Sequence, residues 1–141
     1  MLCTIGYEGA TQAEVIGRLK GAGVAVLVDV RAVASSRRAG FSKTVLRESL
    51  AQAGIDYLHL RALGTPKAGR DAARKGRTAE MRSVHAEQLA TPEAQDQLAE
   101  LEALARARPT AILCFCGRAE GCHRRVLAER LAEAGLPWRD L

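Results

Sequence analysis

Short apolar runs alternate with amphipathic segments along most of the chain. Four such runs predict strands, and they cover residues 2–5, 25–30, 55–60 and 111–115. Between them, apolar residues recur three or four positions apart, as Val15, Ile16 and Leu19 do, which predicts helices with one buried face. Strand alternating with helix is typical of an α/β fold, in which helices cover both faces of a mostly parallel sheet.

Capping and stop signals mark where the predicted helices begin and end. Thr11 and Glu14 have the spacing of a capping box, and Ser42 precedes a second helical pattern that Gly54 terminates. Further helices are expected over residues 79–89, over residues 93–107 after a Thr-Pro start signal, and after His123 up to Gly135. Residues 61–78 are rich in Gly and Arg and have no apolar period, so they predict a basic loop or lid, or a helix without a buried face.

We expect a single domain over residues 1–141, a Rossmann-like three-layer sandwich with a four-stranded sheet in the order 3-2-1-4. That order follows if the crossovers are right-handed and the fourth strand returns beside the first. Open α/β sheets bind ligands where the strand order reverses, at the carboxyl ends of the strands. Gly6 and Tyr7 are therefore expected next to residues 114–116, with Asp29 and Arg31 one strand away.

Composition adds a regional charge to this picture. The net charge of the 141 residues is +5, but residues 31–82 hold twelve Lys and Arg against four Asp and Glu. Such an excess predicts a face that meets phosphates or polyanions, or else a solvated surface in a chain that prefers Arg to Lys. No segment approaches the roughly 18 apolar residues of a membrane span, and the first residues lack a basic leader region. We therefore expect a cytoplasmic protein without a membrane partner, in which the four cysteines are thiols, thiolates or metal ligands.

The segment C-G-R-A-E-G-C-H, residues 116–123, joins the fourth strand to the last helix. Unpaired N–H groups at a helix start attract anions and stabilise a thiolate, so we expect Cys122 to have a pKa below about 8.5 and to be reactive together with His123. The alternative is that Cys122 packs as a small hydrophobic residue under the helix.

Metal binding is a competing use of the same segment. Cys114, Cys116, Cys122 and His123 make a Cys3His set within ten residues. Structural zinc sites usually pair their cysteines two to four residues apart, and this spacing lacks that form. We therefore predict no metal and no cofactor, and keep a zinc-stabilised domain as an alternative.

A second polar cluster follows the second strand. Arg31 and Arg37 offer guanidinium forks that match a phosphate, and Ser36 lies between them. Asp29 is expected to orient Arg31 or to act as a general base, unless the two form a pair that fixes the loop. At the end of the first strand, Tyr7 could stack on a ligand and Glu8 could supply a carboxylate or be a turn residue in solvent.

The remaining histidines are expected to serve the fold. His59 ends a strand beside Arg61 and is interpreted as structural, and His85 is expected on a helix surface.

Taken together, these segments resemble the family catalogued as domain of unknown function 488. The matching pieces run in order from residue 4 to residue 124: T-I-G-Y-E-G (4–9), V-D-V-R (28–31) with S-R (36–37), G-F-S (40–42), G-I-D-Y-L-H-L (54–60) with L-G (63–64), and L-C (113–114) leading to C-H-R (122–124). The resemblance implies a compact α/β domain whose motif residues gather at one end of the sheet. It implies no reaction, because none is established for the family.

This chain departs from the family pattern at three places. The family usually has Glu where this chain has Cys116, and its prolines are replaced at Ala34 and near Ala119. If the family acts through that Glu, this member has lost the activity or changed its chemistry, and Cys116 could act as a resolving thiol for Cys122. A weaker likeness is to rhodanese and related phosphatases, whose Cys-to-Arg spans enclose five or six residues, whereas seven lie between Cys116 and Arg124 here.

These features predict an anion-binding crevice that binds or processes a nucleotide, a nucleic acid or another phosphorylated ligand. Arg31, Arg37 and Arg124 would hold the phosphate, and Cys122, His123 and Asp29 are the reactive candidates. The other expected binding residues are Gly6, Tyr7, Glu8, Ser36, Cys114 and Cys116. The alternatives are a rhodanese- or phosphatase-like thiol enzyme using Cys122 or Cys116, and a non-enzymatic zinc-stabilised or partner-binding domain. The sequence leaves open whether the protein is an enzyme and what its oligomeric state is.

Overall fold

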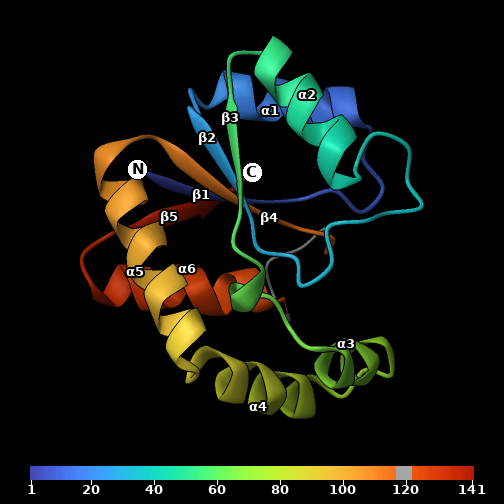
Figure 1. Cartoon of the computed structure of the whole chain (residues 1–141), viewed down its shortest axis with the longest axis vertical. Helices are drawn as coiled ribbons and strands as arrows, with labels where there is room; N and C mark the ends of the chain where they lie inside the picture. Colours follow the sequence, from blue (N-terminus) through green and yellow to red (C-terminus); the bar gives the residue numbers. More distant parts are fainter. Residues whose placement is uncertain (117–121) are drawn as a thin grey trace.

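A computed structural model describes residues 1–116 and 122–141, and its centre is a five-stranded, all-parallel sheet. The strands are β1 (Leu2–Gly6), β2 (Val26–Asp29), β3 (Asp56–His59), β4 (Thr110–Cys114) and β5 (Trp138–Asp140). Figure 1 shows them surrounded by the helices α1 (Gln12–Gly21), α2 (Lys43–Gln52), α3 (Lys67–Arg74), α4 (Thr78–Leu89), α5 (Pro92–Ala107) and α6 (His123–Glu133), with a 3-10 turn η1 (Arg61–Leu63). The predicted Rossmann-like α/β fold is confirmed.

Two hydrophobic cores lie on opposite faces of the sheet, because side chains alternate along each strand. On one face Ile5, Leu27 and Leu113 pack with residues of α1 and α2. On the other face Val28 and Ile112 pack with residues of α4, α5 and α6. In Figure 1, α1 and α2 lie to the upper right of the strands, and α5 and α6 lie to the lower left. The three layers of the predicted sandwich are therefore present.

The predicted strand order 3-2-1-4 is wrong in detail, since the observed order is β3-β2-β4-β1-β5. β4 enters between β2 and β1, where it pairs Cys114 with Gly6 on one side and Leu113 with Asp29 on the other. All five residues of β4 are buried. A strand of mostly apolar residues buries the most apolar surface in the middle of the sheet, where helices cover both of its faces. The fifth strand, β5, was not predicted because Trp138-Arg139-Asp140 is short and polar.

The central position of β4 decides which segments meet at the carboxyl edge of the sheet. The Glu8 amide donates to the Phe115 carbonyl at 2.8 Å, and the Val30 amide donates to the Leu113 carbonyl at 3.2 Å. The segments after β1, β2 and β4 therefore converge on one place, as the sequence predicted, although Asp29 and Arg31 now follow a neighbour of β4 rather than of β1.

Local sequence signals explain most of the helix boundaries. Thr11 and Glu14 form the expected reciprocal capping box at the start of α1. Ser42 is the N-cap of α2, but its hydroxyl bonds to the backbone of Ser36 instead of to the helix, at 3.1 and 3.2 Å. Gly54, which follows α2, has the positive φ of 76° that a glycine adopts without strain.

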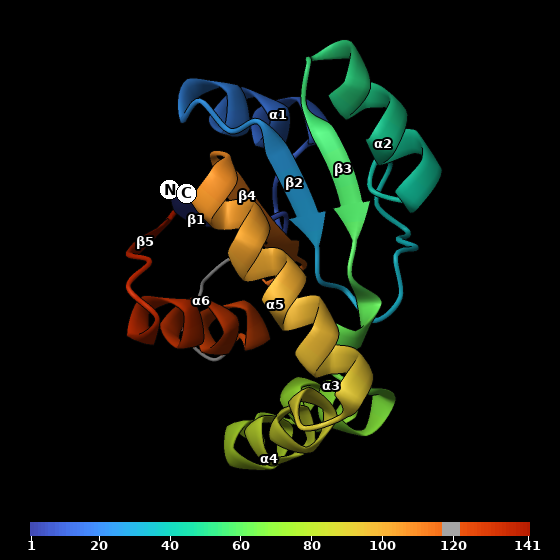
Figure 2. The ribbon, with the colours of Figure 1, turned by 60° about the vertical axis from the view of Figure 1, so that its left-hand side comes forward.

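Residues 61–78 are largely helical, although the sequence left a basic loop open. They hold η1 and α3, and α3 buries Gly69 and Ala72 while packing against α4. In Figure 2, α3 and α4 lie beyond the arrowheads of β2 and β3. Among the described residues, no helix has the length and apolar character needed to cross a membrane.

Candidate functional site

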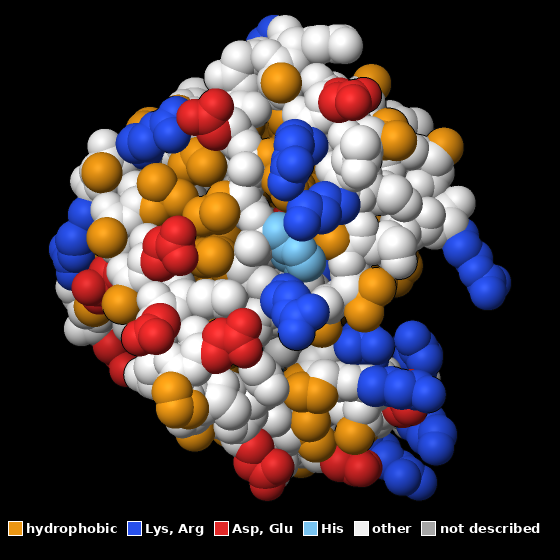
Figure 3. Space-filling model, viewed as in Figure 1, with side chains coloured by type: hydrophobic (Ala, Val, Ile, Leu, Met, Phe, Trp, Pro, Cys, Tyr) orange, Lys and Arg blue, Asp and Glu red, His pale blue; other side chains and the backbone are white. Residues whose placement is uncertain are grey.

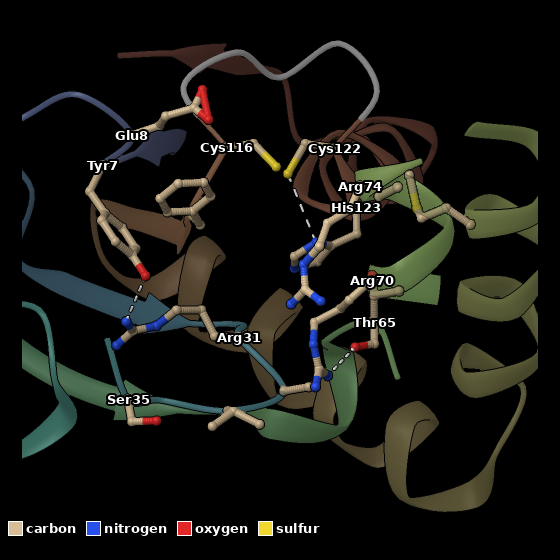
Figure 4. A pocket seen from close by; sticks show the side chains of 15 residues that line it. Tyr7, Glu8, Arg31, Ser35, Thr65, Arg70, Arg74, Cys116, Cys122 and His123 are labelled. Carbon is tan, nitrogen blue, oxygen red and sulfur yellow. Dashed lines mark hydrogen bonds between the residues drawn. The ribbon is translucent and has the colours of Figure 1, made fainter. Parts of the chain in front are cut away.

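A pocket of about 640 Å³ opens at the carboxyl ends of the strands. Its walls come from the segments after β1, β2 and β4, from the start of α6, and from α3 and α4 (Figure 4). The lining residues are Tyr7, Glu8, Arg31, Ala32, Val33, Ser35, Thr65, Arg70, Ala73, Arg74, Met81, Phe115, Cys116, Cys122 and His123. The predicted site edge and the observed pocket therefore coincide.

About half of the predicted site residues line this pocket. Those that do are Tyr7, Glu8, Arg31, Cys116, Cys122 and His123. Those that do not are Gly6, Asp29, Ser36, Arg37, Cys114 and Arg124. Residues 117–121 of the C-G-R-A-E-G-C-H segment, including the departure near Ala119, lie outside the described residues.

Asp29 and Arg31 form a buried, bidentate ion pair. Nε of Arg31 donates to Oδ1 of Asp29 at 2.9 Å, and its second terminal nitrogen donates to Oδ2 at 2.6 Å. The Tyr57 hydroxyl also donates to Oδ2, at 2.5 Å, and Arg31 donates to the Tyr7 hydroxyl at 3.1 Å. Asp29 is fully buried and Arg31 is 6% exposed. These contacts support the interpretation in which the pair fixes the loop.

The ion pair also shifts the proton affinities of its members. Burial lowers the pKa of Arg31, but the hydrogen bond and charge of Asp29 outweigh it and raise the pKa overall. Burial and the hydrogen bond to Asp29 raise the pKa of Tyr57. The guanidinium of Arg31 and the phenol of Tyr57 therefore keep their protons at neutral pH.

Arg124 is fully buried and connects β4, the residues after it and β5. Its NH1 nitrogen donates to the Cys116 carbonyl and lies 3.1 Å from the Cys114 sulfur, while NH2 pairs with Asp140 at 3.1 Å. Burial lowers the pKa of Arg124, but the charge of and hydrogen bond to Cys114 raise it overall. Arg124 thus makes its contacts with the protein interior and lies outside the pocket lining.

The other expected phosphate-binding residues also lie outside the pocket lining. Arg37 is exposed. The Ser36 hydroxyl accepts a hydrogen bond from the Arg38 backbone amide at 3.1 Å, and the Ser36 backbone is held by Ser42. This loop is therefore held by its own contacts at one side of the pocket.

Three cysteine sulfurs gather at the pocket wall. The sulfurs of Cys114, Cys116 and Cys122 all lie within 4.8 Å of one another, and those of Cys114 and Cys122 are 2.8 Å apart. Figure 4 shows the sulfurs of Cys116 and Cys122 pointing toward each other. Cys3 also carries a free thiol, but it lies in the core on the α1 and α2 face of the sheet.

The thiol with the lowered pKa is Cys116 rather than Cys122. Hydrogen bonds from Cys114 and Cys122 stabilise the Cys116 thiolate and lower its pKa to about 2, against the effect of burial. For Cys122, the contact with Cys114 is outweighed by its hydrogen bond to Cys116, by burial and by the Cys116 charge, which raise its pKa to about 12. Burial raises the pKa of Cys114. We expected a lowered pKa for Cys122, and this expectation is wrong. A helix start stabilises a thiolate, but here the neighbouring Cys116 sulfur carries the negative charge, and that charge opposes ionisation of Cys122.

His123 is neutral and points one ring nitrogen toward this group of sulfurs. Its Nε2 lies 3.2 Å from the Val30 carbonyl, where only a protonated nitrogen makes a hydrogen bond, so Nδ1 keeps its lone pair. Nδ1 is 3.8 Å from the Cys122 sulfur. Burial lowers the pKa of His123 to about 4.

His85 is buried, so the prediction that it lies on a helix surface is wrong. Its Nε2 lies 2.9 Å from the Leu63 carbonyl, and its ring meets that of His123 edge to face at 5.3 Å. Burial lowers its pKa. Met81, His85 and Leu89 recur every four residues on α4, and this period could have shown the burial. His59 has the expected structural contact, from Nε2 to the Arg31 carbonyl at 2.7 Å.

The sequence predicted a basic loop or lid over residues 61–78, but it did not single out the pocket residues of α3 and of the turn before it. Arg70 and Arg74 are one helical turn apart and both line the pocket. Arg70 donates to the Thr65 carbonyl at 3.0 Å, and the buried Thr65 hydroxyl has no hydrogen-bond partner among the described residues. Figure 3 shows Lys and Arg side chains gathered over α3. The four-residue spacing of the two arginines was the available signal.

Comparison with known proteins identifies the family of the chain and gives no individual relative. A family model described as "Domain of unknown function DUF488" matches residues 11–131. No curated protein and no solved structure matches the chain.

Proposed function

The chain belongs to the DUF488 family of domains of unknown function, and from that premise we propose that its strand-end pocket binds a small phosphorylated ligand, such as a nucleotide. The observation that carries this proposal is the pair formed by Arg70 and Thr65 in the pocket wall: the Arg70 guanidinium donates to the Thr65 carbonyl, and the buried Thr65 hydroxyl has no hydrogen-bond partner among the described residues.

Arg70 is the cation best placed to bind an anion. Among the described residues it makes no ion pair, since the nearby Asp71 carboxylate pairs with Arg74 at 2.9 Å. Within the described part of the chain its one side-chain hydrogen bond goes to the neutral Thr65 carbonyl, which leaves further N–H donors for a ligand. A guanidinium binds phosphate oxygens in a fork, and the Thr65 hydroxyl can donate to the same group.

The rest of the pocket suits a ligand that also has an apolar or planar part. Phe115 is 47% exposed and Val33 is 54% exposed, and both line the pocket. Exposed apolar side chains around a cavity are typical of binding sites. The Tyr7 ring stacks on the Phe41 ring, with centroids 4.3 Å apart, and packs edge to face with the Phe115 ring at 5.3 Å. These contacts hold the Tyr7 ring in the pocket wall, where it would face a base.

Pocket size favours a small molecule over a nucleic acid. A volume of about 640 Å³ lies within the usual range for drug-sized ligands. Single-strand binders normally add several exposed aromatic side chains along a basic groove. We therefore propose the nucleotide-sized ligand and treat a polyanion as an outcome of the test.

The alternative is a rhodanese- or phosphatase-like thiol enzyme using Cys122 or Cys116. Cys116 is partly exposed and lines the pocket, so it is the more accessible of the two thiols. The pocket gives weaker support to Cys122. Cys122 is only 3% exposed, and its sulfur lies 2.8 Å from that of Cys114. A nucleophile needs access to its substrate, so this thiol would have to leave its neighbours before it could react.

The test is equilibrium binding of AMP, adenosine and inorganic phosphate, measured by calorimetry at constant ionic strength. We expect AMP to bind more tightly than adenosine, because only AMP carries the phosphate. Replacing Arg70 with Ala should weaken AMP binding by about tenfold or more, as expected for losing a charged hydrogen bond. Thr65→Val should weaken it less and leave adenosine unaffected.

Arg82→Ala is the matched control, because it removes the same charge from an exposed residue of α4 outside the pocket lining. Equal AMP affinity in wild type and Arg70→Ala would overturn the proposal. So would an equal loss in Arg70→Ala and Arg82→Ala, which would indicate general electrostatic attraction. In that case a steep salt dependence of single-stranded DNA binding would point to a polyanion surface.

A further inference from the structure

Three thiols from the segment that joins β4 to α6 converge beside the pocket. Cys114 ends β4, Cys116 lies two residues further on, and Cys122 is the N-cap of α6. Their sulfurs all lie within 4.8 Å of one another. Three sulfurs bound to one ion at about 2.3 Å are about 4 Å apart, so the observed arrangement is close to that of a three-thiolate metal site.

The fold holds this arrangement by backbone contacts that do not depend on the thiols. The Glu8 amide bonds to the Phe115 carbonyl, and Arg124 donates to the Cys116 carbonyl. Cys114 is fully buried and Cys122 is 3% exposed, whereas Cys116 is partly exposed and lines the pocket. Two ligands are thus fixed in the interior, and the third stands where an ion can enter.

The charges near the sulfurs favour a divalent ion. Three thiolates with a divalent ion carry one net negative charge. The buried Arg124 guanidinium, 3.1 Å from the Cys114 sulfur and 3.9 Å from that of Cys122, offsets this charge. Asp140 pairs with Arg124 on the far side and is 35% exposed, so solvent screens it. A monovalent ion would leave more buried negative charge uncompensated.

We propose that Cys114, Cys116 and Cys122 form a binding site for a single zinc ion, with the fourth coordination position directed toward the pocket. All three sulfurs bind as thiolates, any thiol proton still present is lost to solvent, and no oxidant or reductant is involved. Zinc favours thiolate and imidazole ligands, and three protein ligands with one open position are typical of its accessible sites. The site in this structure requires the 2.8 Å contact between Cys114 and Cys122 to open by about 1 Å.

His123 supports the same proposal from the pocket side. Its Nδ1 keeps a lone pair 3.8 Å from the Cys122 sulfur, because Nε2 bonds to the Val30 carbonyl. The Val30 carbonyl behind the ring fixes which ring nitrogen carries the proton. A neutral imidazole here can accept a hydrogen bond from a water molecule in the fourth position.

The test is metal binding by the reduced, full-length protein after chelator treatment. We expect it to take up one zinc ion in competition with a chromophoric chelator, and cobalt(II) in its place to give a thiolate-to-metal charge-transfer band. Cys116→Ser should weaken zinc binding by more than about a hundredfold, since the loss of a second-shell group alone costs ten- to a hundredfold.

Cys3→Ala is the matched control, because it removes a thiol from the opposite core and should leave zinc affinity unchanged. Circular dichroism of Cys116→Ser should match wild type, since the replaced side chain is partly exposed. Absence of stoichiometric zinc binding by the reduced protein would overturn the proposal, as would an equal loss in Cys3→Ala or a cobalt spectrum without the thiolate band. The zinc site and the proposed anion site use different residues, so each test can fail without the other.

Discussion

Gly6 shows how one residue can act at a site without touching a ligand. A Cβ atom built on Gly6 would lie 1.5 Å from the Cys116 carbonyl oxygen and 2.6 Å from the Arg124 guanidinium. The segment after β4 therefore closes over the end of β1 only because this position has no side chain. The sequence marked Gly6 as a binding residue, and its contacts in the structure are with the protein itself.

Gly6→Ala should destabilise the fold by about 1–3 kcal/mol or more, because the added methyl group would overlap the Cys116 backbone, which can shift only by distorting the neighbouring structure. Urea unfolding measures the effect. Gly17→Ala is the matched control, since nothing lies within 4 Å of a Cβ at that position in α1. It should stabilise the protein by up to about 1 kcal/mol. Equal stability of Gly6→Ala and wild type would contradict the close approach.

Arg31→Met should destabilise the protein by about 3–5 kcal/mol, because it leaves the Asp29 carboxylate buried without its cation. The exposed pair of Arg77 and Glu80, 3.7 Å apart, provides the comparison. Arg77→Met should cost less than about 1 kcal/mol, as exposed ion pairs usually do. Similar unfolding free energies for the two variants would mean that Asp29 finds another partner.

At the scale of elements, capping signals predicted helix starts better than apolar patterns predicted helix faces. The α1 capping box could be predicted because its two partners are three residues apart. The buried face of α3 could not, because it consists of Gly69 and Ala72, which carry almost no hydrophobic signal. A Cβ on Gly69 would lie 3.2 Å from Val84, so small size is what lets α3 approach α4.

Thr11→Ala should reduce the free energy of unfolding by about 1 kcal/mol, since it removes the side chain that accepts from the Glu14 amide at 3.1 Å. Thr11→Ser keeps that oxygen and should be close to wild type. Thermal and urea unfolding of both variants test the expectation. An equal loss in the two variants would show that the Thr11 methyl group matters, rather than the cap.

Across the whole molecule, two histidines, the buried His85 and the partly buried His123, connect stability to pH. His85 and His123 face each other between α4 and α6, and burial lowers the pKa of both, to about 4 for His123. The positive charge of Arg130 also opposes protonation of His85, whereas a Cys116 thiolate favours protonation of His123. The unfolded chain binds these protons near pH 6.5 and the folded chain does not.

Stability should therefore be fully present above about pH 6.5 and should fall as the pH drops toward 4. Urea midpoints at about pH 7.5, 6.5 and 5.5 test this before most carboxylates titrate. Proton NMR of the imidazoles should show the His123 ring still neutral at about pH 5.5 and the His85 ring titrating below its ordinary pKa of about 6.5. A flat urea midpoint over this range, or a His123 ring that titrates near pH 6.5, would contradict the prediction.

The sequence by itself determined the α/β class, most element positions and the edge of the sheet where the site lies. These depend on apolar period, capping residues and strand ends, which are local properties of a few neighbouring residues. The chemistry-bearing segment 114–124 could be found in the same way, because its cysteines, His123 and Arg124 are close together in the sequence.

Only the tertiary structure decided what those residues do. Asp29 pairs with Arg31 two residues away, but Arg124 pairs with Asp140 of β5, and the approach of α3 brought Arg70 and Thr65 to a pocket that Tyr7 and Cys116 also line. Likewise, the lowered pKa falls on Cys116 because two other sulfurs surround it. The places of α3 at the pocket and of β5 beside β1 depend on contacts between residues far apart in the sequence, and no local pattern of apolar residues or caps specifies the free energies of those contacts.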